Sequence, residues 1–166
     1  MYNELTKSDI KKMQEEIEYR KCVVRKQALE DVKEARAHGD LSENFEYHAA
    51  KKVKNQNEGR IRYLERMIRT AVVIEDDSAE DEIGINDTVE ILIEEDKSVE
   101  TYKLVTTVRG DSLNGLISVE SPMGKSLLGH KVGDKVSIKV NDNYSYDVIV
   151  QRIDKSDDEN DKMRNY

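Results

Sequence analysis

The chain has 166 residues, of which 37% are apolar and 37% are charged. That length suits one or two small domains with at least one buried core. The charged fraction exceeds the roughly 25% of an average soluble protein, which favours an elongated molecule with much exposed helix. The single cysteine, Cys22, excludes an intramolecular disulfide and a cysteine-based zinc site, and no apolar run approaches the length of a membrane span. We therefore expect a cytoplasmic protein that does not contact a membrane.

The net charge of −8 is divided unevenly along the chain. Residues 1–74 carry 16 Lys and Arg against 13 Asp and Glu, a net charge of +3, whereas residues 75–166 carry 11 against 22, a net charge of −11. A charge of +3 is too small to indicate autonomous binding of DNA, and the acidic second half opposes such binding.

Residues 1–75 are predicted to form an antiparallel α-helical coiled-coil hairpin. Apolar or small residues recur at spacings of three and four, which is typical of a helix that packs along one face. Glycine occurs in residues 1–74 only at Gly39 and Gly59, and proline does not occur there, so the reversal is expected at residues 39–42. Each arm of about 30 residues would be roughly 45 Å long. The first series is Ile10, Met13, Ile17, Val24, Ala28, Val32 and Ala35, and the second is Ala50, Val53, Asn57, Ile61, Leu64, Met67 or Ile68, and Ala71.

Three positions interrupt this apolar pattern. Asn57 and the charged step at Arg20 or Lys21 weaken the apolar contact, and in a coiled coil such residues more often set the register than add stability. Gly59 costs about 1 kcal/mol relative to alanine inside a helix. It is either an ordinary interruption or a site of close helix approach.

The second half changes to the period of β-strands. Residues 76–87 are predicted to be an acidic connector, residues 88–154 a small α+β domain with a largely antiparallel sheet, and residues 155–166 a polar tail that does not pack. Pro122 stands at the first turn of a short helix over residues 122–129, with Ser121 available as its cap. The strands are expected at residues 88–94, 101–108, 116–119, 135–140 and 145–153.

The residues of greatest chemical interest, GDLSENFE at 39–46, lie at the reversal of the hairpin. Asp40 and Glu43 have the spacing of a capping box, which would stabilise the following helix by about 0.5–2 kcal/mol. Alternatively, both carboxylates point outward and hold a hard cation such as Mg²⁺, which prefers oxygen ligands. Two carboxylates bind such an ion weakly, so a partner that carries phosphates would have to share it.

The sequence resembles the bacterial Gre transcript-cleavage factors of the GreA type. The match consists of the run EARAHGDLSEN at residues 34–44, the runs EYHAAK at 46–51 and EGRI at 58–61, and a second signature, LISVESPMGKSLLG, at 116–129 with VGD at 132–134. Together these motifs span nearly the whole chain, in the family's order and separation. The resemblance implies an N-terminal coiled coil followed by a small FKBP-like domain of antiparallel sheet plus a short helix.

The family's activity is implied in the same way. The globular domain would dock at the rim of the secondary channel of RNA polymerase core through the segment with Ser121 and Pro122, and the coiled coil would enter the channel. There Asp40 and Glu43 would share Mg²⁺ with the polymerase and position a water for cleavage of the 3′ end of backtracked RNA. Such a factor is a monomer, binds no metal stably alone, and is a cofactor of the polymerase instead of an enzyme.

Further residues near the reversal are candidates for supporting roles. Ser42 and Asn44 would shape the turn or orient water, and Tyr47 would either stack on an RNA base or pack at the end of the hairpin. Phe45 replaces the family's usual small residue, and it either packs under the turn or faces the channel. His38 and His48 are solvated or contact RNA more readily than they bind metal. A basic patch for RNA phosphates is formed by Lys33, Arg36, Lys51, Lys52 and Lys54, unless these are simply a solvated helix face.

Three other functions remain as alternatives. A Gre-like protein can occupy the channel and inhibit transcription without stimulating cleavage. A structural coiled coil would oligomerise through its long helices. An FKBP-like peptidyl-prolyl isomerase would need an apolar pocket lined by aromatic residues, and residues 88–154 contain neither Trp nor Phe.

Overall fold

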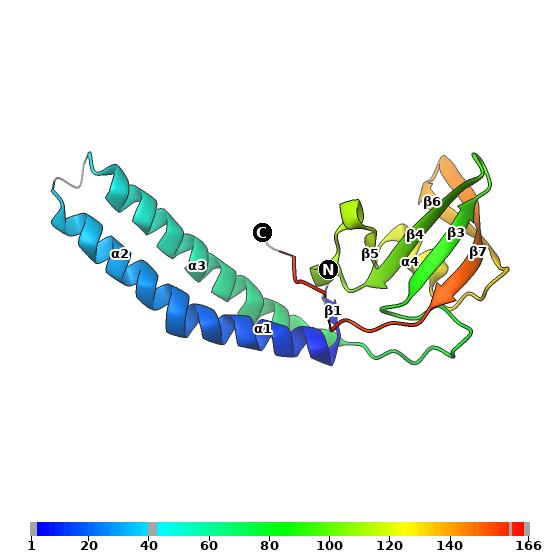
Figure 1. The fold of residues 1–166 in the computed structure, drawn as a ribbon, viewed down its shortest axis with the longest axis horizontal. Coiled ribbons are helices and arrows are strands. Elements are labelled where there is room, and N and C mark those ends of the chain that lie inside the picture. Colours follow the sequence, from blue (N-terminus) through cyan, green and yellow to red (C-terminus); the bar gives the residue numbers. More distant parts are fainter. Residues whose placement is uncertain (1–2, 40–42, 160, 165–166) are drawn as a thin grey trace. The chain divides into compact units, whose positions relative to one another are not determined.

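A computed structural model describes residues 3–39, 43–159 and 161–164 (Figure 1). It divides into two compact units, one of residues 10–71 and the other of residues 3–9 together with 72–164. The elements in chain order are β1 (Glu4–Leu5), α1 (Lys7–Tyr19), η1 (Arg20–Val24), α2 (Arg25–Ala37), α3 (Phe45–Thr70), β2 (Val72–Val73), β3 (Thr88–Ile93), β4 (Ser98–Val105), η2 (Thr107–Arg109), η3 (Ser112–Asn114), β5 (Leu116–Ser118), α4 (Pro122–Leu127), β6 (Lys135–Asn141) and β7 (Tyr144–Asp154).

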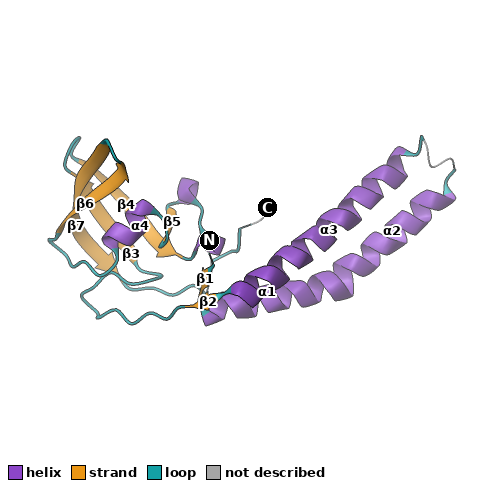
Figure 2. Cartoon of the chain, turned by 180° about the vertical axis from the view of Figure 1, so that it is seen from behind, coloured by secondary structure: helices purple, strands orange, loops and turns teal. Residues whose placement is uncertain are grey.

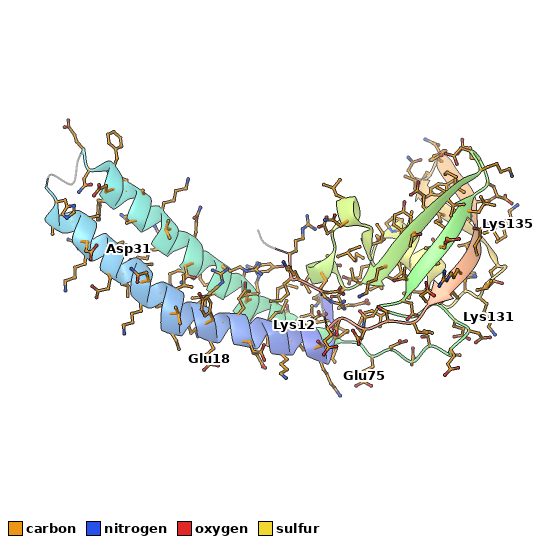
Figure 3. The ribbon with its side chains drawn as sticks, viewed as in Figure 1. Lys12, Glu18, Asp31, Glu75, Lys131 and Lys135 are labelled. Atoms are coloured by element: carbon orange, nitrogen blue, oxygen red, sulfur yellow. The ribbon has the colours of Figure 1, made fainter. Side chains whose placement is uncertain are left out.

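The first unit is an antiparallel helical hairpin, as the apolar periodicity predicts. One arm runs through α1, η1 and α2, and α3 returns alongside it (Figure 2). Charged side chains such as Glu18 project from the outer side of the first arm (Figure 3). The periodicity predicts Val53 at the seam, and this prediction is wrong because the Val53 side chain is 52% exposed. The buried apolar residues of the seam are Met13, Ala28, Ala35, Ile61, Leu64 and Met67.

The first arm is not a uniform α-helix. A π-helical segment, η1, lies at the charged step that interrupts the apolar series, and the N–H of Arg25 donates to the carbonyl oxygen of Arg20. Such a bulge inserts an extra residue into the helical turn and shifts the faces on either side of it. This shift is how the first arm continues to bury a seam after Arg20.

The second unit contains a five-stranded sheet in the order β5-β4-β3-β7-β6. β3 pairs antiparallel with β4 and β7, β6 pairs antiparallel with β7, and the edge strand β5 runs parallel to β4. Period-two alternation produces one buried face, because neighbouring side chains of a strand point to opposite sides. The predicted α+β class with a largely antiparallel sheet and one short helix is therefore confirmed.

The core of the sheet unit lies between the sheet and α4. Leu127 from α4 packs against strand residues, and Ile83 and Ile85 join the same core although they belong to the segment that the composition marks as a connector. Two apolar residues in an acidic segment are a weak signal, which explains why the composition does not reveal them as core. The buried strand residues are Val89, Ile91, Leu104, Val136, Ile138, Val148 and Val150.

The first residues of the chain also belong to the sheet unit. β1 pairs in parallel with β2, and Thr6 and Asp9 form a capping box at the start of α1 in which each backbone N–H donates to the other side chain at 3.1 Å. The sequence predicts a tail that does not pack, whereas the Asp161 carboxylate accepts hydrogen bonds from Lys103 and Arg109. Among the described residues, no helix has the length and apolar character to span a membrane.

Candidate functional site

The reversal of the hairpin is described up to Gly39 and again from Glu43. Gly39 has a φ of +136°, a left-handed value that favours glycine, and it follows the last residue of α2 and its cap, His38. Asp40 and Ser42, two of the predicted site residues, lie outside the described residues, so their roles remain predictions. Glu43 is described and its side chain is exposed.

Asn44 links the two arms at this end of the hairpin. Its side-chain oxygen accepts a hydrogen bond from the backbone N–H of Tyr47 at 3.0 Å, which makes Asn44 the N-cap of α3. Its side-chain nitrogen donates to the carbonyl oxygen of Ala35 at 2.6 Å, near the end of α2. One side chain therefore satisfies a backbone donor of one helix and a backbone acceptor of the other.

This cap decides the alternative readings of Glu43. In a capping box led by Asp40, Glu43 would be the third residue of a helix, but α3 begins at Phe45 and Glu43 precedes its cap. The capping interpretation of Glu43 is therefore wrong. Within the described residues the Glu43 carboxylate forms no hydrogen bond or ion pair, so it is available to an external ligand.

Phe45 presents an apolar surface beside Glu43. Its side chain is 86% exposed, which excludes the alternative that it packs under the turn. A fully exposed phenylalanine leaves on the order of 2 kcal/mol of possible burial unused. Tyr47 is half-buried and its ring is tilted against that of His48 with centroids 5.6 Å apart.

The histidines near the reversal are not organised as metal ligands. His38 Nδ1 lies 3.3 Å from Glu46 Oε2, which connects the end of α2 with the first turn of α3. Among the described residues no group of three His, Cys, Asp or Glu side chains is placed to hold a metal ion. A Mg²⁺ site that includes Glu43 would therefore depend on ligands from outside this set.

The predicted basic patch divides between the two arms. Lys33 and Arg36 are exposed on α2, and Lys51 and Lys52 are exposed on α3. None of these four cations forms an ion pair with a described carboxylate. Both arms therefore present positive charge close to the reversal.

Ser121 and Pro122 occupy the start of α4. The Ser121 hydroxyl donates to the carbonyl oxygen of Ser118 at 2.6 Å and accepts from the N–H of Gly124 at 3.1 Å, so it is the predicted helix cap. Pro122 is exposed at the first helical position. Both residues line a groove of about 970 Å³. Its other walls include Leu113, Leu116, Met123, Ile138, Val140 and Tyr146.

This arrangement, a helical hairpin followed by a sheet domain, coincides with two family matches. The family described as "Transcription elongation factor, N-terminal" matches residues 3–73, and the one described as "Transcription elongation factor, GreA/GreB, C-term" matches residues 77–155. The chain belongs to the GreA/GreB family of transcription elongation factors. The resemblance inferred from the sequence motifs is thereby confirmed.

Individual GreA/GreB relatives cover most of the chain. The transcription elongation factor GreA of Thermoanaerobacter pseudethanolicus is 47% identical over 137 residues, which are 82% of this chain and 87% of that protein. The GreA of Bacillus subtilis is 42% identical over 135 residues, 81% of this chain and 86% of that protein. A crystal structure of GreA factor homolog 1 of Thermus thermophilus is 28% identical, covers 93% of this chain and 100% of its own, and has a TM-score of 0.42.

Two buried polar groups of this GreA/GreB family member were not anticipated from its sequence. One is the ion pair of Asp9 with Arg109, for which the only sequence signal was the capping-box spacing from Thr6 to Asp9. The other is the contact of Arg60 with Glu16 inside the hairpin. The periodicity could have indicated it, because Arg60 stands beside the seam residue Ile61, but a charged residue is normally assigned to the solvent face.

Proposed function

We propose that this elongation factor docks on RNA polymerase core, inserts its hairpin into the secondary channel and stimulates the polymerase's own cleavage of backtracked RNA. The observation that carries the proposal is the state of Glu43, which is exposed and takes no part in the helix cap because Asn44 fills that role. A carboxylate that forms no hydrogen bond or ion pair with the described residues is available to a partner.

Asp40 and Glu43 are the residues proposed to act in the polymerase. Mg²⁺ shared with the polymerase would stabilise the attacking and leaving oxygens of the hydrolysis. The exposed carboxylate of Glu43 fits this role because oxygen ligands suit the ion and one or two carboxylates commonly suffice when phosphates complete its shell. The chain itself contributes charge and the orientation of the attacking water, with Ser42 and Asn44 shaping the turn.

The length of the arms supports insertion into a channel. α3 has 26 residues and is about 39 Å long at 1.5 Å per residue. Its first turn carries Phe45 and Tyr47, which can stack on an unpaired base. Lys33, Arg36, Lys51 and Lys52 would attract the phosphates of the extruded RNA strand.

Docking is proposed at the start of α4. The Ser121 hydroxyl is already engaged with Ser118 and Gly124, so its contribution is to hold Pro122 at the edge of the groove instead of bonding directly to the partner. Pro122→Ala is expected to weaken binding to polymerase core without changing the unfolding temperature of the factor. Unchanged binding would exclude Pro122 from the docking surface.

The test of cleavage uses backtracked elongation complexes with Mg²⁺ and follows the release of 3′ RNA fragments. Asp40→Asn and Glu43→Gln are expected to lower the stimulated rate at least tenfold while binding to polymerase is retained. Glu46→Gln is the matched control, since it removes the same charge from an exposed side chain in the first turn of α3. If the wild type binds and slows transcription without releasing fragments, the alternative of a channel-binding inhibitor replaces this proposal.

A further inference from the structure

A layer of polar side chains crosses the middle of the hairpin, inside a seam that is otherwise apolar. It consists of Glu16 and Arg20 from the first arm and of Asn57 and Arg60 from α3. Asn57 is only 3% exposed and Arg60 only 7%. These four residues are called the polar layer below.

The contacts of the polar layer are specific to one alignment of the arms. Arg20 Nη1 donates to Asn57 Oδ1 at 3.0 Å, and Arg60 Nη2 donates to Glu16 Oε2 at 3.2 Å. The remaining oxygen of Glu16 lies 3.3 Å from Arg20 Nη2. The two arginines therefore converge on the Glu16 carboxylate, and Arg20 also binds the Asn57 amide.

The π-helical segment takes part in the same recognition. The carbonyl oxygen of Arg20 accepts from the N–H of Arg25 across the bulge and also from Asn57 Nδ2 at 3.3 Å. Asn57 therefore forms hydrogen bonds with both the side chain and the backbone of Arg20. An apolar side chain at position 57 would make neither contact.

Two exposed or partly exposed ion pairs flank the polar layer and agree with the same alignment. Arg25 donates to both carboxylate oxygens of Glu58 at 2.7 and 2.9 Å, and Lys21 lies 2.6 Å from Glu65. The bidentate geometry makes the Arg25–Glu58 ion pair directional. These cross-arm polar contacts near the bulge all belong to one register. Within that register Arg20 Nε and Arg60 Nε and Nη1 are buried without a hydrogen-bond partner among the described residues.

A displaced register would bury these groups without partners. Sliding α3 by one heptad would bring Asn57 beside Met13 or, past the bulge, beside Ala28. The alanine side chain forms no hydrogen bond, and the methionine sulfur is only a weak acceptor. Buried polar groups without partners are strongly disfavoured. Apolar residues alone discriminate poorly between registers of the two arms, because a slip by one heptad again places apolar residues against one another.

We infer that the polar layer is a positioning device that holds the hairpin in one register and so holds Glu43 and its turn in the geometry required for cleavage. The role in cleavage rests on the proposed function. A slip by one heptad would displace the arms by about 10 Å, and a catalytic group must be placed to within about 1 Å. Asn57 is the positioning residue because its contacts join the arms at the bulge.

The register is measured by the distance between nitroxide labels on Cys substituted for Asp31 and Arg62, both exposed, in a Cys22→Ser background. The wild type is expected to show one narrow distance distribution. Asn57→Leu is expected to keep its helix content but to show a second or broadened distribution, because leucine fits several registers. Asn57→Asp, which retains the acceptor for Arg20, is expected to restore the single distribution.

The same variants without labels are then compared in RNA cleavage. Asn57→Leu is expected to lower stimulated cleavage at least tenfold with polymerase binding retained, whereas Asn57→Asp keeps most of the activity. Gln14→Leu adds the same leucine to an exposed position of α1 and is expected to change neither readout.

Each outcome bears on a different statement. The positioning role requires that Asn57→Leu keeps its helices and that its arms populate a second register. An unchanged single distance in this variant, or a loss of its helix content, overturns that role. A broadened distance with unchanged cleavage overturns the link between register and activity. If the wild type fails to stimulate cleavage, the proposed function falls, while the distance measurements still decide the register.

Discussion

Asp9 and Arg109 are 100 residues apart in the sequence and form an ion pair with 2.7 Å between Oδ1 and Nε, and neither side chain is exposed. The other Asp9 oxygen accepts from the Thr106 hydroxyl at 2.7 Å and from the Thr6 N–H at 3.1 Å. The pair thus fastens the first residues of the chain to the loop after β4 within the sheet unit.

Asp9→Asn is expected to lower the free energy of unfolding of the sheet unit by about 1.5–3 kcal/mol, because it removes one of the two carboxylates that lie 2.7 Å from the buried Arg109 guanidinium. Denaturant unfolding measures the loss. Glu75→Gln is the control, as it removes the exposed ion pair with Lys7 and is expected to leave the midpoint unchanged. Equal effects of the two substitutions would contradict the role of burial.

Asp161→Asn should detach the segment after β7 from the sheet unit. Its carboxylate oxygens lie 3.0 Å from Lys103 Nζ and 2.7 Å from Arg109 Nη1, and hydrogen bonds of this charged type contribute about 1.5–3 kcal/mol. Faster amide exchange of residues 161–164 is the expected readout. Glu159→Gln removes an exposed charge from the same segment and should not alter exchange. No difference between the two variants would show that the ion pairs do not hold the segment.

Two glycine substitutions are expected to act in opposite directions. At Gly59, within α3, an added Cβ would meet only the end of Arg62 at 3.9 Å, so the structure favours an ordinary interruption over a close helix approach. Gly59→Ala should stabilise the hairpin by about 0.5–1 kcal/mol. At Gly124 the Cβ would collide with the backbone of Ser118, so Gly124→Ala should destabilise the sheet unit. Thermal unfolding followed by circular dichroism separates the two effects.

Acidification is expected to weaken the hairpin through Glu58. Its hydrogen bond with Arg25 lowers the pKa of the Glu58 carboxyl from its ordinary value. A glutamate with a lowered folded pKa contributes stability above the unfolded pKa, about 4.3, and loses it as the pH falls through the folded value. When the pH is lowered past about 4.3, the melting temperature of the hairpin should therefore decrease. The Glu58→Gln variant should be less stable than the wild type at neutral pH. Its melting temperature should also change less between neutral and acidic pH.

Much of the fold could be predicted from the periodicity of apolar residues and from the residues that favour turns. The spacings of three and four predicted both arms, and Gly39 marked the reversal because a left-handed residue is needed there. The strands were anticipated to within a few residues, since alternation and turn formers are local signals. β4 was the least accurate, because residues 107–109 form a 3₁₀ turn that interrupts the predicted strand.

At the reversal, the acidic pair and the family motif could be recognised from the sequence alone, because both are contiguous in the chain. The tertiary structure was needed to show that Asn44 caps α3, because the competing caps, Asp40 and Asn44, are only four residues apart and the choice depends on where the second arm meets Ala35. The same holds for the polar layer and for Asp9 with Arg109. Whether a charged residue is buried depends on a partner that lies far away in the sequence, and local patterns carry no information about that partner.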